Sequence, residues 1–276
     1  MKARLFVLAA AVLWSTAGAA IKLTGLSGLQ ISSGRSLVAA AVLLLLVPAA
    51  RKRPSRKAIW AALAYAATVT LFVIANKLTT AANAIFLQDA APLYVMLLSP
   101  FLLGERPSRS ELTSAPIFLV GLALFFFDQL SPGQMLGNAV AIASGVAFAL
   151  AIIGLRAVAE EGPVALAWGN LVAGVGVAPF AAAGFDPVAN DWLVLAWLGI
   201  FQLAAAYLLF SRGVRETPAT EASLLILIEP VLSPVWTFVF AGERPGPWAL
   251  AGGAVILAAT LWRVVVAARV KGAQPA

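Results

Sequence analysis

The sequence predicts an all-α membrane protein, with ten transmembrane helices arranged as two inverted five-helix repeats around a central cavity. The first observation behind this prediction is composition: 62% of the 276 residues are hydrophobic, 11% are charged, and the mean hydropathy is +0.94. Soluble domains carry about 25% charged residues. The second observation is that apolar runs recur along the whole chain. The third is that one four-residue turn occurs twice, half a chain length apart.

Each predicted helix rests on length and composition. A helix that crosses about 30 Å of hydrocarbon needs about 20 mostly apolar residues. Membrane β-strands would be about ten residues long and would alternate in polarity, and the sequence shows no such alternation. In chain order, the predicted helices cover residues 4–24, 30–50, 57–76, 79–103, 110–128, 134–157, 163–183, 192–211, 217–241 and 247–267.

The breaks between these helices are rich in glycine, proline and charged residues, which is typical of turns. The first helix begins with basic residues, like a signal peptide, but another apolar run follows at once. We therefore interpret it as a retained transmembrane helix. In chain order, the breaks read GLSG, RKRPSRK, NKLTT, GERPSR, DQLSPG, EEGP, GFDPVAND, RGVRETP and GERPGP.

The distribution of Lys and Arg predicts how the chain is threaded, because cytoplasmic loops of membrane proteins are enriched in these residues. With a cytoplasmic N-terminus, 15 of the 19 Lys and Arg residues lie on the cytoplasmic side and 4 on the outer side. Both termini are therefore predicted to be cytoplasmic. The four outer residues are Lys22, Arg35, Lys77 and Arg244.

The repeated turn is Gly-Glu-Arg-Pro, at 104–107 and again at 242–245, an offset of 138 residues. Each half then holds five helices, an odd number, so the second half enters the membrane from the opposite side. The halves, 1–131 and 132–276, are predicted to be inverted repeats. Other identities at this offset pair Ala84 with Ala222, Leu87 with Leu225, and Pro92 with Pro230.

We interpret the repeated turn itself as structural. Its glycine can close the incoming helix in a left-handed cap, and its proline can begin the next helix. Neither Glu105 nor Glu243 is expected at membrane depth. The inverted repeat, by contrast, indicates function, because exchanging the conformations of two similar halves converts an inward-open cavity into an outward-open one.

Charged residues at membrane depth indicate where a substrate would bind, since they are costly unless they face protein or water. Asp89 and Glu229 are the two deep carboxylates. Asp89 could accept a substrate ammonium group, carry a coupling proton, or serve as a buried hydrogen-bond acceptor. Pro92 and Pro230 are expected to kink their helices, and matched kinks are either hinges or packing features.

Around these kinks we expect a cavity with aromatic walls and a few hydrogen-bonding groups, which suits a zwitterion with an apolar side chain. Single tryptophans are more often interfacial or packing residues, and mid-span Trp14 and Trp236 are the better candidates. The candidate substrate-binding residues are Trp14, Ser15, Gln88, Asp89, Tyr94, Trp168, Asn170, Gln202, Tyr207, Glu229 and Trp236. The candidate gate or hinge residues are Lys22, Arg35, Pro92 and Pro230. Lys22, Arg35 and Lys77 gather at the outer ends of their helices, where they could attract a substrate carboxylate or form part of an outer gate. For Lys77 we expect instead a side chain that reaches the membrane interface.

Several stretches resemble one family. VLWST with Lys22, Arg35 in the second helix, APLYVMLLSPFLLGERP and IEPVLSPVWTFVFAGERP are similar to the EamA type of the drug/metabolite transporter superfamily. The resemblance covers essentially the whole chain. It implies a metabolite exporter, often of amino acids, in the bacterial inner membrane. The LWST start resembles the YddG-type exporters of amino acids, including aromatic ones.

Other functions are disfavoured by what the sequence lacks. It has no Cys or His, which excludes disulfides, thiolate chemistry and Ser-His triads, and no P-loop for ATP. We therefore expect no enzyme, no cofactor, no metal and no ATPase subunit. The expected partners are a small-molecule substrate and the lipid bilayer, not nucleic acid. A multidrug or quaternary-cation exporter is the alternative, and both facilitated export and proton antiport stay open.

Overall fold

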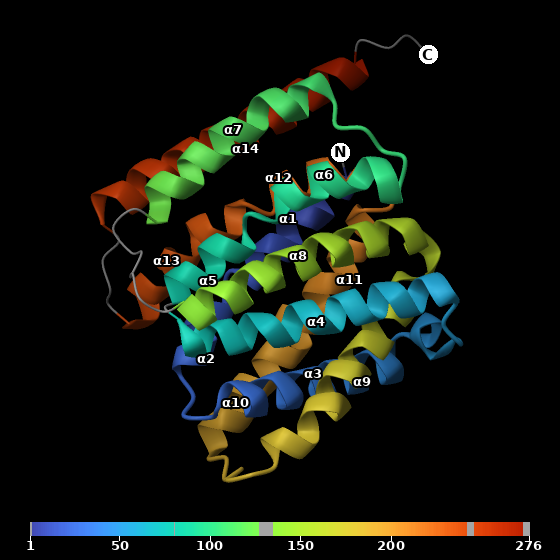
Figure 1. Cartoon of the computed structure of the whole chain (residues 1–276), viewed down its shortest axis with the longest axis vertical. Coiled ribbons are helices and arrows are strands. Elements are labelled where there is room, and N and C mark those ends of the chain that lie inside the picture. Colours follow the sequence, from blue (N-terminus) through green and yellow to red (C-terminus); the bar gives the residue numbers. More distant parts are fainter. Residues whose placement is uncertain (1, 80, 127–134, 242–245, 273–276) are drawn as a thin grey trace.

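The computed structural model describes residues 2–79, 81–126, 135–241 and 246–272, and every regular element within these ranges is a helix (Figure 1). The all-α prediction is confirmed. In chain order the elements are α1 (Lys2–Trp14), α2 (Ala17–Lys22), α3 (Gly28–Leu46), η1 (Pro48–Arg51), α4 (Arg56–Leu78), α5 (Ala81–Gln88), α6 (Ala91–Leu102), α7 (Arg109–Phe126), α8 (Met135–Val158), η2 (Ala159–Glu161), α9 (Gly162–Ala181), α10 (Ala189–Trp197), η3 (Leu198–Ala205), α11 (Ala206–Gly213), α12 (Ala219–Leu225), α13 (Ile228–Ala241) and α14 (Pro247–Gly272).

Several stretches of the described chain are long and apolar enough to cross a membrane. They number five, and the fourth of them contains both α8 and α9. Between them they overlap six of the predicted helices: 4–24, 30–50, 57–76, 134–157, 163–183 and 192–211. The five stretches are Lys2–Ile21, Gly28–Leu46, Arg56–Leu78, Met135–Ala181 and Ala189–Gly213.

Three predicted helices are broken rather than continuous. The predicted helix 4–24 is α1 and α2, 79–103 is α5 and α6, and 217–241 is α12 and α13. The last two breaks lie just before Pro92 and Pro230, which stand in the first turns of α6 and α13. A proline lacks the backbone N–H and disfavours helical geometry at the residue before it. The expected kinks are therefore complete interruptions.

The first copy of the repeated turn has the expected glycine cap. Gly104 has φ of +70°, in the left-handed region that ends helices, directly after α6. The next helix is capped by Ser108, whose backbone N–H donates to Glu111 (2.6 Å) and whose hydroxyl accepts from the Glu111 N–H (3.2 Å). This reciprocal pair is a capping box. The second copy, 242–245, lies outside the described residues.

The helices pack around a core that joins both halves of the sequence. α4 packs against α8 and α9, α3 packs against α9, and α1 packs against α11. α7 and α14 pack on each other at the top of Figure 1 and share a further apolar cluster with Leu224 of α12. Much of the outer surface is apolar, for example at Leu46, Phe101 and Phe180, which are 75%, 82% and 72% exposed. Such a surface fits a lipid surrounding.

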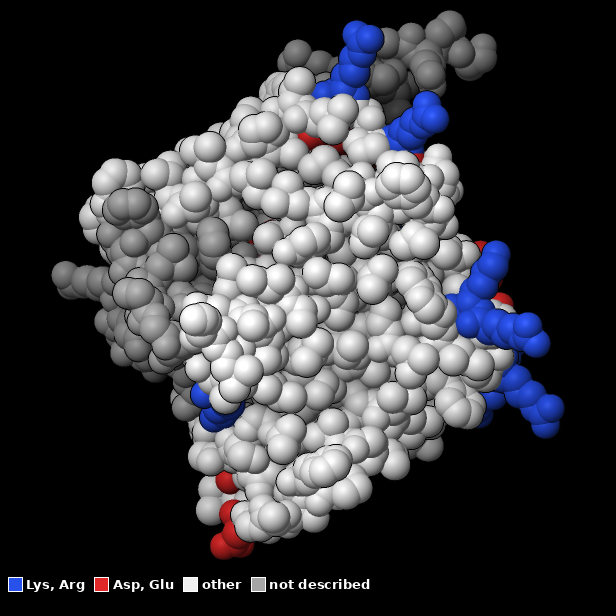
Figure 2. All heavy atoms as spheres, in the orientation of Figure 1, with Lys and Arg blue, Asp and Glu red and all other residues white. Residues whose placement is uncertain are grey.

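Basic side chains gather at one edge of the molecule, where α4 begins and α8 ends (Figures 1 and 2). Two polar contacts hold the connections of this edge together: the Ser55 N–H donates to Glu161 (3.1 Å), and Arg215 pairs with Glu160 (3.3 Å). We call this edge the basic end. The predicted cytoplasmic connections 51–57 and 212–218 therefore lie at the same end of the protein.

Candidate functional site

A small cavity lies between the two halves, with a volume of about 20 Å³. Its lining comes from helices of both halves, α1, α3, α4 and α5 from the first and α8, η3, α11 and α13 from the second. A volume of this size holds about one water molecule, so an amino acid would require the cavity to expand. The lining residues are Trp14, Arg35, Thr68, Val69, Phe72, Gln88, Phe148, Gln202, Tyr207 and Glu229.

Arg35 is the cation of the cavity, and its side chain is fully buried. Its Nη1 donates to Gln202 Oε1 (3.0 Å) and its Nη2 to the carbonyl of Val69 (2.7 Å). Within the described residues its Nε has no hydrogen-bond partner and no carboxylate pairs with it. A buried charge held only by neutral groups is costly. The guanidinium is therefore prepared to receive an anionic group, and carboxylates fit its planar fork.

The sequence placed Arg35 at the outer end of its helix, where it could attract a substrate carboxylate or form part of an outer gate. α3 begins at Gly28, one residue after the capping Ser27, whose hydroxyl accepts from the Gln30 N–H (3.3 Å). Seven residues of helix then place Arg35 about 10 Å from the start of α3. Its side chain lies at the cavity, and its role in an outer gate stays a prediction.

Gln202 reaches Arg35 from η3, a π-helical turn of the kind often found at functional sites. Gly199 brings this turn close to α3. A Cβ at Gly199 would meet Val38 Cβ at 2.6 Å and the Arg35 carbonyl oxygen at 2.8 Å. Only glycine permits this approach, so Gly199 fixes the distance between Gln202 and Arg35.

We predict that Gly199→Ala lowers the unfolding free energy by about 1–3 kcal/mol, because the methyl overpacks the contact between η3 and α3. A matched control is Gly176→Ala on α9, where an added Cβ meets no atom within 4 Å. Thermal unfolding in detergent compares the two variants. Equal unfolding temperatures for both would show that the close approach is not required.

Aromatic rings form one wall of the cavity. Trp14 lies 4.6 Å from Tyr207, 5.2 Å from Phe210 and 5.7 Å from Phe148, measured between ring centroids. Tyr65 packs edge-on against Tyr207 at 4.6 Å. The polar atoms of this wall are the Tyr65 and Tyr207 hydroxyls and the Trp14 indole N–H, and the last has no partner among the residues described. The rings can therefore pack against an apolar part of a ligand, while the indole N–H can donate to a polar part.

The two deep carboxylates lie at the two helix breaks. Glu229 stands in the first turn of α13, half-buried, and lines the cavity. Asp89 directly follows α5 and is 4% exposed, and within the described chain its Oδ2 has no partner. Discontinuous helices of this kind typically form the substrate and ion sites of transporters.

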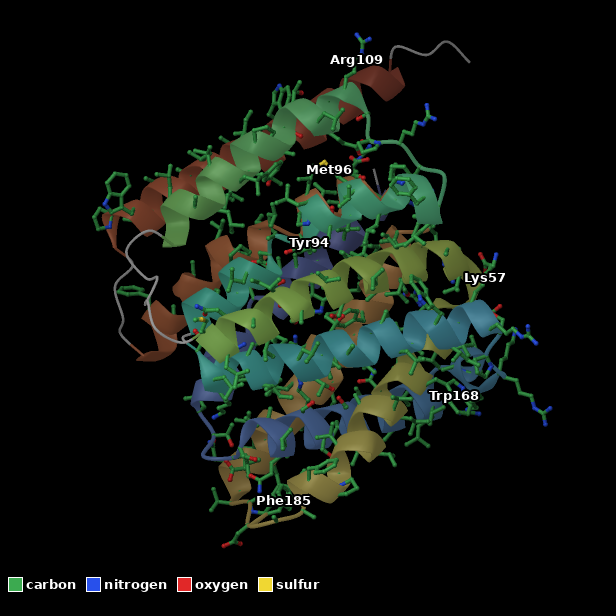
Figure 3. The ribbon with its side chains drawn as sticks, in the orientation of Figure 1. Lys57, Tyr94, Met96, Arg109, Trp168 and Phe185 are labelled. Atoms are coloured by element: carbon green, nitrogen blue, oxygen red, sulfur yellow. The ribbon has the colours of Figure 1, made fainter. Side chains whose placement is uncertain are left out.

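Other predicted residues support the cavity from outside it. Asn170 is buried and exchanges hydrogen bonds with the Tyr65 hydroxyl (3.0 and 3.2 Å). Ser15 accepts from Trp236 Nε1 (2.8 Å) and thereby joins α1 to α13. Tyr94 on α6 is half-buried against the main core (Figure 3). These residues hold the walls and do not line the cavity.

The remaining predicted residues have different positions. Trp168 is 42% exposed on α9 and is not among the lining residues of this cavity, so its substrate contact stays a prediction without support from this geometry (Figure 3). Gln88 lines the cavity as expected and donates to Ser144 Oγ (3.0 Å). The side chain of Lys22 lies outside the described residues. Lys77 is exposed, as expected for a chain that reaches the interface.

Sequence reasoning missed four lining residues: Thr68, Val69, Phe72 and Phe148. Two signals could have found them. Thr68 is a polar residue in the middle of an apolar helix, and Tyr65, Thr68 and Phe72 share one helical face by their spacing. Phe148 occupies the position that corresponds to Trp14 when the opening helices of the two halves are aligned.

Comparison with known proteins decides the family. A model of the EamA-like transporter family matches the chain twice, over residues 1–127 and 135–265. The chain belongs to the EamA-like transporter family. The resemblance seen in the sequence is thereby confirmed at the level of the family, and the chain is a multi-pass membrane protein.

Relatives of this EamA-like chain are named as transporters. It is 32% identical to an uncharacterized transporter of Archaeoglobus fulgidus over 217 residues, 76% of this chain and 78% of that one. It is 28% identical to the threonine/homoserine exporter RhtA of Escherichia coli over 199 residues, 69% of this chain and 65% of RhtA. A solved crystal structure with 22% identity matches at a TM-score of 0.81 and covers 94% of this chain and 95% of that chain, which supports the fold alone.

Proposed function

We propose that this chain is a secondary transporter that exports small metabolites, with amino acids as its substrate class, by alternating access through the cavity between its halves. The observation that carries this proposal is Arg35. It is a buried guanidinium that lines the cavity and has only neutral partners among the described groups. A substrate carboxylate would complete its coordination.

The other lining residues fit a substrate that is a zwitterion. Glu229 faces the same cavity and would receive an ammonium group, while Trp14 and Tyr207 would contact an apolar side chain. Amino acids of either the RhtA or the YddG-type substrate class carry both charges. The named activity of RhtA, export of threonine and homoserine, is in keeping with this proposal.

Ten membrane crossings in two inverted halves, 1–131 and 132–276, are part of the proposal. Packing contacts support a pseudo-two-fold correspondence between the halves. In it, α1 corresponds to α8, α3 to α9, and α4 to η3 together with α11. Under that correspondence the contact of α4 with α8 becomes that of α11 with α1, and the contact of α4 with α9 becomes that of η3 with α3. All four contacts exist. The boundary between the halves lies outside the described residues.

We further propose that the basic end faces the cytoplasm of a bacterial inner membrane, with both termini on that side, because cytoplasmic loops are enriched in Lys and Arg. Substrate would then enter at the basic end and leave at the opposite end. The energy would come from the substrate gradient itself or from proton antiport through Asp89 or Glu229.

The alternative is export of drugs or quaternary cations. Glu229 and the aromatic wall are the features that favour it, since rings and a carboxylate attract cations. Arg35 opposes it, because an uncompensated positive charge beside the cavity repels a fixed cation. The two functions therefore differ in whether the substrate needs a carboxylate.

The deciding experiment is transport by the purified protein in proteoliposomes, with and without a pH gradient. The substrates to compare are threonine, homoserine, phenylalanine, the amides of these amino acids, and tetraethylammonium. We expect transport of the free amino acids and little transport of their amides or of tetraethylammonium. Transport of tetraethylammonium without transport of any amino acid would overturn the proposal in favour of the alternative.

A further inference from the structure

The first Gly-Glu-Arg-Pro turn does more than reverse the chain. Glu105 accepts two hydrogen bonds from the second half of the sequence. Its Oε1 accepts from Arg156 Nε (2.8 Å), and its Oε2 accepts from the backbone N–H of Ala219 (3.1 Å). One carboxylate thus holds the last turn of α8 and the first residue of α12 together.

Arg156 extends this junction. Its Nη1 donates to the carbonyl of Val214 (2.8 Å) and to that of Arg215, both in the connection between α11 and α12. The side chains of Arg156 and Glu105 are 23% and 27% exposed. Ion pairs that are largely shielded from water are screened less by salt than exposed ones.

A second ion pair crosses between the halves at the same helix. Arg4 of α1 contacts both carboxylate oxygens of Glu221 in α12, Nε to Oε1 at 2.6 Å and Nη2 to Oε2 at 3.2 Å. Their side chains are 17% and 8% exposed. Two-pronged pairs of this kind combine strength with fixed orientation. The short helix α12 is therefore tied to the first half at both Ala219 and Glu221.

The position of α12 indicates what its contacts with the first half do. α12 packs against α6 at the basic end, and the break that follows it leads directly into α13 and Glu229, which lines the cavity. An opening toward the basic end in which α12 moves away from α6 and α1, against which it packs, would break both ties. It would pull Ala219 from Glu105 and Glu221 from Arg4.

We propose that the pairs Glu105–Arg156 and Arg4–Glu221 form a latch that holds the basic end closed, and that breaking the latch opens the cavity to that end. The inference rests on the proposed alternating access. The latch assigns a role to Glu105 that the structural interpretation of the turn does not contain. It also predicts that neutralising either pair shifts the protein toward the state that is open at the basic end.

The test uses a single reporter cysteine, which is possible because the chain contains none of its own. Thr68→Cys places the reporter in the cavity lining. Membrane vesicles are prepared with the basic end facing the medium, and the rate of labelling by a membrane-impermeant maleimide is measured. We expect Glu105→Gln or Arg4→Gln to raise this rate about tenfold, the effect of losing one charge-assisted contact.

A matched control lies at the same end. The pair Arg215–Glu160 joins two residues of the second half, and Glu160 is 86% exposed. Glu160→Gln should leave the labelling rate within about twofold of the parent, since exposed pairs contribute little. The double exchange of Arg4→Glu with Glu221→Arg should bring the rate back toward the parent value, whereas Arg4→Glu alone should raise it.

Unchanged labelling in Glu105→Gln and Arg4→Gln proteins that unfold at the parent temperature would overturn the latch. An equal rise in Glu160→Gln would overturn it too, because the effect would then not depend on ties between the halves. Labelling requires no substrate. The latch can therefore stand where amino acid transport is not found, and it can fail while transport is intact.

Discussion

Replacing Arg35 with glutamine is expected to reduce amino acid transport about 100-fold, since a charge-assisted hydrogen bond contributes about 1.5–3 kcal/mol and each 1.4 kcal/mol is tenfold. The guanidinium lies at the cavity and has only Gln202 and the Val69 carbonyl as described partners. A substrate carboxylate would lose its cation. Initial rates of counterflow in proteoliposomes measure the effect.

Stability separates this binding role from a structural one. Removing a buried charge that has no described counter-ion should leave the unfolding temperature unchanged or raise it, because the desolvation of that charge is relieved. Arg35→Lys is the second variant, and it should retain more transport than Arg35→Gln because the charge stays. A lower unfolding temperature together with normal transport in Arg35→Gln would show that Arg35 supports the fold and not the substrate.

Replacing Trp14 with a smaller residue is expected to change which amino acids are transported. The Trp14 ring is 2% exposed and packs on Phe148, Tyr207 and Phe210. Trp14→Ala enlarges the cavity, so transport should shift toward larger side chains, by about 10-fold or more in the ratio of phenylalanine to threonine rates. Competition between the two labelled substrates in one preparation measures this ratio.

The large cavity left by alanine carries a stability cost of about 3–5 kcal/mol, so Trp14→Phe is the milder companion. It should shift the ratio in the same direction by a smaller amount, with near-normal expression. Trp60 is 39% exposed and outside the cavity lining, and Trp60→Phe is the matched control that should leave the ratio unchanged. Parental rates for every substrate in both Trp14 variants would show that the cavity is wrongly placed.

The helices were predictable from the sequence because the cost of exposing backbone polar groups to lipid leaves few alternatives to a helix. It was less predictable whether an individual residue faces lipid or the protein interior. In a membrane protein the lipid side of a helix is as apolar as its packed side, so α9 shows no periodic pattern that would have placed Trp168 outside and Asn170 inside. Both residues therefore looked alike as candidates.

Two other features were hard to predict from the sequence: how far along its helix a residue lies, and which residues distant in sequence are in contact. Arg35 was expected at the outer end of its helix because the helix start was predicted at residue 30, and the capping pair Ser27 and Gln30 shows that the helix begins at Gly28. Glu105 was correctly placed beside a helix cap, but Arg156 is 51 residues away in sequence. No local pattern indicates a contact at that distance.

The size of the cavity has a consequence for the leakage of ions through this protein. A space of about 20 Å³ holds about one water molecule, so this cavity by itself forms no file of water across a bilayer. If the chain works as proposed, we expect a carrier in this state to pass few protons or sodium ions between transport cycles. The membrane voltage would then be kept while no substrate is being exported.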